Sequence, residues 1–338
     1  MEHRESEPSK RIERQSPDST LSRQTLTIQI LEDLKKNDSL DEKIAAGEID
    51  HQALFDAISQ HPLFVVTKKP LLAKDPKSPI IILLEDKHGS PKLDYRKITF
   101  LQETYNINFV GLEGWAGHQT DKERGHRYLN AEEETIAALI DDKKFQTIPL
   151  ENPEQQIDTL KTVIAIYTIY IWLYTELKDH FGLDKHKEAT YENYGYNLDI
   201  LMKKFKKLLP GGITNLDKLA QEYQERLEID FDKMRVQPGE SKDEYYRRVY
   251  IQQIKLHKNL DKITNEPRSI TGAKLFTKSL KTNKRHIGVM LFGSAHSQKL
   301  VEELQKNLGD CTILRFSSEE PEELPPIEEV NPINHNAA

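Results

Sequence analysis

The sequence predicts an α/β protein with a mostly parallel sheet and a large helical insertion. Two unbroken apolar runs, residues 80–84 and 287–292, are too short for buried helices and are typical of strands covered on both faces. The second run is followed by a helical pattern and by another short apolar run, 311–316, and a strand, helix and strand joined so closely form a right-handed parallel unit. Residues 153–280 lie between the two parts of this sheet and show almost only helical periodicity.

The first half of the chain alternates strands and helices. Residues 1–24 contain Arg, Glu, Ser and Pro with almost no apolar side chains, so burial cannot offset the loss of chain entropy and we expect a disordered tail. The sequence then predicts a short helix from Leu26, a helix over 41–59, an edge strand over 63–67 and a loop over 70–79. The strand over 80–84 is followed by a helix over 92–105 and a strand over 107–112. After these we expect an irregular loop over 116–129, a helix capped by Asn130 and Glu133, and a short strand over 147–150.

The second half begins with the insertion, which we expect to form a lid or one wall of a pocket. After the strand that begins at 287, Ser297 can cap a helix, and Gly309 is placed to end it in a left-handed conformation. The predicted division of the chain is a disordered tail over 1–24, a first part of the core over 25–152, the insertion over 153–280, a second part of the core over 281–316, and an acidic disordered tail over 317–338.

The composition excludes several classes of protein. A net charge of -7 speaks against general nucleic-acid binding, which needs a basic surface. The one cysteine, Cys311, lies in a predicted strand and is expected to be a small buried hydrophobe. The amino terminus has no apolar stretch of the secretory type, and the longest uncharged stretch, 162–175, is shorter than the roughly 20 residues that span a bilayer. We therefore expect a cytoplasmic protein with no transmembrane segment, although export by another route stays open.

Ionisable residues follow four of the predicted strands. Asp86 and His88 follow the first, Glu113 the second, Glu151 the third and His296 the last. Because the carboxyl ends of parallel strands meet at one edge of a sheet, residues more than 200 positions apart can converge there. The sequence thus predicts a site at this edge.

Two chemistries suit this set of side chains. Imidazole nitrogens and carboxylate oxygens can ligate Zn, Mn, Fe or Co and leave a position for an activated water. Without a metal, a His can act as general base on water while a carboxylate orients it. Each residue also has an ordinary structural explanation, because a His after a strand is often simply hydrogen-bonded and a carboxylate there often caps the next helix, as for Glu151 before Pro153.

A cluster of Tyr and Arg lies early in the last long helix of the insertion. Arg247 and Arg248 could contact an anionic substrate together with Glu151, or pair with Glu113. An ion pair on a helix surface is the simpler alternative.

Three short motifs resemble those of a known superfamily. They are Glu85-Asp86-Lys87-His88, Val110-Gly111-Leu112-Glu113 and Gly293-Ser294-Ala295-His296. The pattern is similar to that of the Tiki, TraB and ChaN-like superfamily, which includes the erythromycin esterases and has Gly-x-x-His, a strand ending in Glu, and a late Gly-x-x-His before a helix. Here Glu85 stands where the family has Gly, and the acidic Asp86 stands where several members have Glu. The helix around Arg247 resembles the family's Arg-containing helix, and the resemblance covers residues 78–316 through these short motifs.

The resemblance implies a three-layer α/β/α core with a helical insertion. Tiki-like members are divalent-metal-dependent peptidases, erythromycin esterase-like members hydrolyse an ester with His and Glu and no established need for metal, and ChaN-like members bind haem or iron. For the first two, His88, Glu113 and His296 carry over as the site. If the family's Gly has a positive φ, Glu85 would be strained and His88 aimed differently; Glu85 could equally add an acidic ligand.

The leading hypothesis from the sequence is a hydrolase of a peptide or ester bond, assisted by a divalent metal (Mn, Co, Fe or Zn). His88, Glu113 and His296 would be ligands or catalytic groups, with Asp86 beside them, and the substrate a small molecule or peptide. The alternatives are a haem- or metal-binding protein without turnover, and an inactive module that binds a partner protein through its insertion or its tails.

Overall fold

The computed structural model describes residues 25, 27–31, 39–86, 91–116, 138–208 and 212–317. These residues form a six-stranded sheet with the order β1-β6-β2-β5-β3-β4. The strands are β1 (Val65–Val66), β2 (Ile80–Asp86), β3 (Phe109–Leu112), β4 (Gln146–Pro149), β5 (Ile287–Gly293) and β6 (Thr312–Ser317). Neighbouring strands are parallel except for the edge strand β1, which pairs antiparallel with β6. The predicted α/β fold with a mostly parallel sheet is confirmed.

The two apolar runs form the centre of this sheet. β2 lies between β5 and β6, and β5 lies between β2 and β3, so both strands are buried along their whole length. Their position explains why neither strand shows the alternation of apolar and polar residues found in half-exposed strands.

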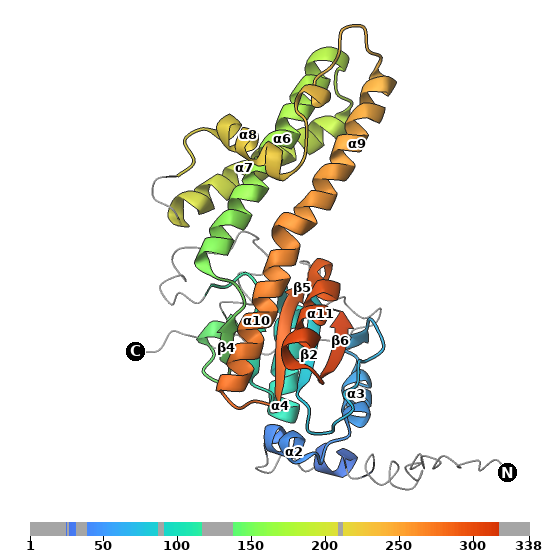
Figure 1. Ribbon diagram of the computed structural model, residues 1–338, viewed down its shortest axis with the longest axis vertical. Helices are drawn as coiled ribbons and strands as arrows, with labels where there is room; N and C mark the ends of the chain where they lie inside the picture. The colour runs from blue at the N-terminus through green and yellow to red at the C-terminus, as the bar shows by residue number, and fades with distance from the viewer. Residues whose placement is uncertain are drawn as a thin grey trace, which may run out of the picture.

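Helices cover both faces of the sheet. One face carries α4 (Pro91–Tyr105), with α2 (Leu40–Ala46) and α3 (His51–Ser59) nearby, and the other carries α10 (Glu266–Thr282) and α11 (Ser297–Leu308) (Figure 1). Because side chains alternate along a strand, Ile82 and Leu84 belong to the first of these cores while Ile81 and Leu83 belong to the second. The molecule therefore has a three-layer core.

Glycines allow α10 to lie close against the sheet. A Cβ atom at Gly111 of β3 would lie 2.7 Å from the Phe276 ring of α10, and one at Gly288 of β5 would lie 2.8 Å from the same ring. No other residue fits these positions without a shift of the aromatic ring.

A second group of helices rises away from the sheet and has a hydrophobic core of its own (Figure 1). This helical arm, residues 153–260, consists of α6 (Pro153–Phe181), α7 (Lys185–Leu208), α8 (Leu216–Arg226), the 3₁₀ turn η3 (Asp232–Met234) and α9 (Lys242–Leu260). α9 continues through a π-helical turn, η4 (Asp261–Asn265), into α10 on the sheet. The arm is thus connected to the core at the start of α6 and at η4.

Of the described helices, α6 is long and apolar enough to cross a membrane by length and composition, with a mean hydropathy of 1.2 over 18 residues. Half of that stretch is buried inside the protein. Core helices of soluble proteins share these properties.

Three details of the sequence prediction are wrong. The helix expected over 41–59 is two helices, because Gly47 takes a left-handed conformation and the Asp50 side chain caps α3 by accepting from the Ala53 N–H. The core resumes before residue 281, because α10 packs on the sheet through Phe276 and other side chains. Ser297 does not cap α11 but is its first residue.

Several predictions fall outside the described residues. They are the tail over 1–24, residues 87–90 with His88, most of the loop over 116–129, the cap at Asn130 and Glu133, and most of the acidic tail from residue 317.

Candidate active site

Three of the predicted site residues meet at the carboxyl edge of the sheet. Glu113 follows β3, Glu151 comes two residues after β4, and His296 comes three residues after β5. The backbone continues the sheet pairing at these ends, since Glu113 N–H donates to the Leu291 carbonyl at 3.1 Å. The order β5-β3-β4 places the three side chains next to one another although they lie up to 183 positions apart, the separation of 113 and 296.

Arg268 of α10 joins the two carboxylates. Its Nη2 lies 2.5 Å from Oε1 of Glu113 and 2.5 Å from Oε1 of Glu151, and its Nε donates to the same Glu151 oxygen at 2.8 Å. The side chains are 10% exposed for Arg268 and Glu113 and fully buried for Glu151. Two buried carboxylates are thus held by one guanidinium, which is the group best shaped for this task.

Arg268 was missed in the sequence. Two carboxylates at adjacent strand ends do call for a nearby cation, but the chain has 48 Lys and Arg residues and Arg268 has no distinguishing motif. Only the return of the chain from the arm onto the sheet brings this arginine to the site.

His296 is held in one orientation by the turn between the arm and the core. Its Nδ1 lies 3.0 Å from the Asn265 carbonyl and 3.2 Å from Oγ of Ser269, which itself donates to that carbonyl at 2.8 Å. A carbonyl can only accept, so Nδ1 carries the hydrogen and Nε2 carries the lone pair in the neutral ring. The edge of the ring packs against Phe292, with the ring centres 5.0 Å apart and the planes at 87°.

Nε2 of His296 faces the ion pair of Glu113 and Arg268. It lies 3.3 Å from Oε1 of Glu113 and 3.5 Å from Nη1 of Arg268. His296 is 4% exposed, and burial lowers the pKa of its ring, against the opposing attraction of Glu113. The imidazole is therefore neutral near pH 7 and able to accept a proton at Nε2.

The acceptor for His296 Nδ1 comes from an unusual piece of helix. Asn265 is the last residue of η4, which has the i to i+5 hydrogen-bonding pattern of a π-helix. Such turns are uncommon and often occur at functional sites. The turn that joins the arm to the core, η4, thus also supplies the carbonyl that orients the His296 ring.

Asp86 belongs to another network on the opposite face of the sheet. It hydrogen-bonds Asp94 and lies near Lys97, both on α4. Burial raises the pKa of Asp94 to about 8 and lowers that of Lys97 to about 8, and Lys97 Nζ donates to the Ser317 carbonyl at 2.5 Å. Because side chains alternate along β2, Asp86 points away from the Glu113 side, so its predicted place beside Glu113 and His296 is wrong.

Glu85 lies in regular β2 and is not strained. It pairs across the sheet with Phe292 and Ser317, and it is not among the described residues with positive φ. Its carboxylate accepts from Nε of Arg315 at 2.6 Å, and both side chains are 8% exposed. The expectation of strain is wrong for the described backbone, and this carboxylate serves a buried ion pair.

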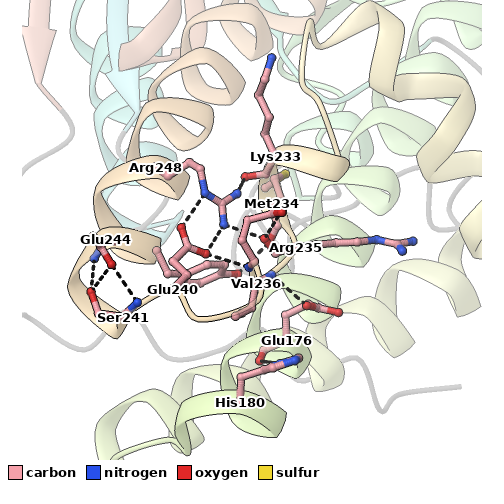
Figure 2. A network of polar contacts seen from close by, with 12 residues as sticks. Glu176, His180, Lys233, Met234, Arg235, Val236, Glu240, Ser241, Glu244 and Arg248 are labelled. Atoms are coloured by element: carbon pink, nitrogen blue, oxygen red, sulfur yellow. Dashed lines mark hydrogen bonds and ion pairs between the residues drawn. The ribbon is translucent and has the colours of Figure 1, made fainter.

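The arginines predicted to contact substrate lie in the arm. Arg248 binds the Glu240 carboxylate through Nε at 2.8 Å and donates to the backbone carbonyls of Lys233 and Arg235 (Figure 2). Arg247 is exposed on α9. The arginine that pairs with Glu113 is Arg268, so the predicted pairing with Arg247 or Arg248 is wrong.

The described side chains do not fit a divalent metal. Oε1 of Glu113 binds Arg268 and Oε2 accepts the Gly293 N–H, so both oxygens are already engaged. A guanidinium between Glu113 and Glu151 opposes a second cation there by charge. Within the described ranges, no three His, Cys, Asp or Glu side chains could share a metal ion.

The chain matches no known family model, no curated protein and no solved structure. The resemblance to the Tiki, TraB and ChaN-like superfamily therefore stays a prediction that depends on the short motifs.

Proposed function

We propose that this protein is a hydrolase of an ester or peptide bond that uses His296 as general base without a divalent metal. The observation that carries the proposal is the neutral His296 ring, fixed through Nδ1 by the Asn265 carbonyl and directed through Nε2 at the Glu113 and Arg268 pair. A base, a group that orients it and a charge that can stabilise an anion are the parts that hydrolysis requires.

The proposed reaction begins with the attack of water on the carbonyl carbon of the ester or peptide. Nε2 of His296 takes one proton from water, the water oxygen forms a bond to the carbonyl carbon, and the carbonyl electron pair moves onto oxygen. Glu113, 3.3 Å from Nε2, stabilises the imidazolium, and Arg268 stabilises the oxyanion. When the tetrahedral intermediate collapses, Nε2 returns its proton to the departing alcohol or amine.

The energetic cost of the cluster supports a functional role. Transferring two carboxylates and a guanidinium out of water is expensive, and apolar residues of similar volume would often stabilise a core as well or better. A buried group of this kind at the carboxyl edge of a parallel sheet, where α/β proteins bind ligands, is a strong candidate for a site.

Substrate binding requires this edge to open. Only 4% of His296 is exposed, so Nε2 cannot meet a carbonyl carbon in the conformation described. Trp115 lies two residues after Glu113 and is 7% exposed, so its fluorescence should report the opening.

The test compares His296→Asn with wild type on a series of nitrophenyl esters and fluorogenic peptides. Asn keeps a donor for the Asn265 carbonyl but removes the base, so turnover should fall about a hundredfold or more. The matched control is His286→Asn, at the residue that precedes β5, which should keep full activity. Equal activity in wild type and His296→Asn would contradict the proposal.

Elemental analysis separates this proposal from a metal-assisted reaction. Wild type should retain its activity after chelation and dialysis, without stoichiometric Mn, Co, Fe or Zn. Activity that disappears on chelation and returns with one of these ions would show that a metal is required and refute the metal-free form.

A further inference from the structure

The outer face of α9 carries an apolar patch that none of the residues described by the structure covers. Tyr250 is 62% exposed, Ile251 56% and Ile254 50%. The opposite face of the same helix is buried, since Tyr245, Val249 and Leu256 belong to the hydrophobic core of the arm. The polar side chains of Gln252 and Asn259 are buried on this face as well. α9 therefore has one apolar face inside the arm and a second one outside it.

The outer face has the spacing of a helix-pairing seam. Asp243, Arg247, Tyr250 and Ile254 follow one another at intervals of four, three and four residues, which is the heptad pattern of positions that face a partner helix. Ile251 and Lys258 flank this line on the same side. At 1.5 Å per residue the seam from 243 to 258 is about 22 Å long.

The seam is complementary to itself when reversed. With a two-fold axis between residues 250 and 251, a residue of one copy faces a residue of the other copy when their residue numbers add up to 501. Asp243 then faces Lys258, Arg247 faces Ile254, and Tyr250 faces Ile251. Each copy contributes both members of every pair, as an isologous interface requires.

The charges favour the reversed arrangement over the parallel one. Asp243 and Lys258 are exposed and make no ion pair with any residue that the structure describes, so each has charge to offer to a partner. In a parallel arrangement Asp243 would face its own copy and Lys258 would face its own copy, which is repulsive at both ends. In the reversed arrangement the aliphatic stem of Arg247 covers Ile254 and its guanidinium reaches solvent.

We propose that α9 docks antiparallel against α9 of a second copy of this chain, with the two-fold axis between Tyr250 and Ile251. Three apolar side chains from each copy are fewer than a standard interface of about 1,600 Å² contains. The dimer is therefore weak, depends on concentration and becomes weaker as salt screens the two Asp243–Lys258 pairs.

The test measures the mass of the full chain by sedimentation equilibrium over a wide range of concentrations at low ionic strength. Wild type should pass from 39.2 kDa to twice that mass. Ile254→Glu places a charge in the apolar centre and should raise the dimer Kd about a hundredfold. Asp243→Lys and Lys258→Asp should each raise the Kd about tenfold, because each change creates two repulsive pairs per dimer.

The decisive result comes from mixing. Asp243→Lys and Lys258→Asp chains mixed together should form a heterodimer at least as strong as the wild-type dimer, because both pairs across that interface are again opposite in charge. The double variant should dimerise with itself for the same reason. Neither result is expected for any interface that does not bring residue 243 of one copy to residue 258 of the other.

The matched control is Glu192→Lys, an equal change of charge at an exposed site on α7 that should leave the Kd unchanged. Melting temperatures of all variants exclude loss of fold as the cause. A wild type that stays monomeric at every concentration would overturn the proposal. A dimer that Ile254→Glu leaves intact, or one that mixing fails to restore, would overturn it as well.

Discussion

Replacement of Arg268 by Met tests whether one guanidinium holds the carboxyl edge together. The substitution removes the partner that lies 2.5 Å from Glu113 and 2.5 Å from Glu151, and it leaves two carboxylates with side chains 10% and 0% exposed. Breaking a buried ion pair by removal of one partner costs about 3 to 5 kcal/mol, because the remaining charge is left without compensation. We expect a loss in this range at pH 7.

The loss should depend on pH in a defined direction. Without Arg268, two buried negative charges have no compensating cation, and burial disfavours the charged form of a carboxyl relative to the protonated form. Protonation removes this penalty in the folded state, so the variant gains stability relative to wild type as the pH falls toward 5 and loses it as the pH rises. Adding Glu151→Gln should recover part of the loss at pH 7, because one of the two uncompensated charges is then absent.

The assay is urea unfolding followed by tryptophan fluorescence in a Trp172→Phe background. The remaining tryptophan, Trp115, belongs to the core beside Glu113 and therefore reports on this edge of the sheet. The control is Arg226→Met, because Arg226 and Asp158 form a pair whose side chains are 43% and 44% exposed, and its loss should cost about 1 kcal/mol or less. A cost below about 1 kcal/mol for Arg268→Met, or a larger cost that does not change with pH, would refute the reasoning.

Because burial lowers the pKa of His296, the acid limb of the pH dependence of kcat/KM should lie below pH 6.5, and a limb above that value would contradict the neutral base. Lys97→Met should cost about 3 kcal/mol or more in urea unfolding, because Lys97 is fully buried beside Asp86 and Asp94, and an unchanged midpoint would show that the carboxyls do not need it. Gly111→Ala should cost about 1 to 3 kcal/mol by overpacking against Phe276, whereas the same change at Gly195, where a Cβ meets nothing within 4 Å, should not destabilise the protein.

The sequence was sufficient to predict those strands whose residue types show by themselves that the strand is buried. The runs at 80–84 and 287–292 are apolar at every position because both faces of those strands are covered, and that property can be recognised without knowing what covers them. The same argument predicted which strand ends share one edge, and Glu113, Glu151 and His296 do meet there.

The partners of those residues could not be predicted, because they depend on contacts between distant segments. Arg268 lies on a helix within the helical region and reaches the sheet only because η4 redirects the chain from α9 into α10. Asp86 and Glu85 are neighbours in sequence, yet side chains alternate between the two faces along β2. Asp86 therefore bonds to Asp94 of α4, whereas Glu85 pairs with Arg315. Local sequence determined which residues lie at the carboxyl edge of the sheet, and only the tertiary structure decided which charges meet there, since buried charges find their partners through the packing of whole helices.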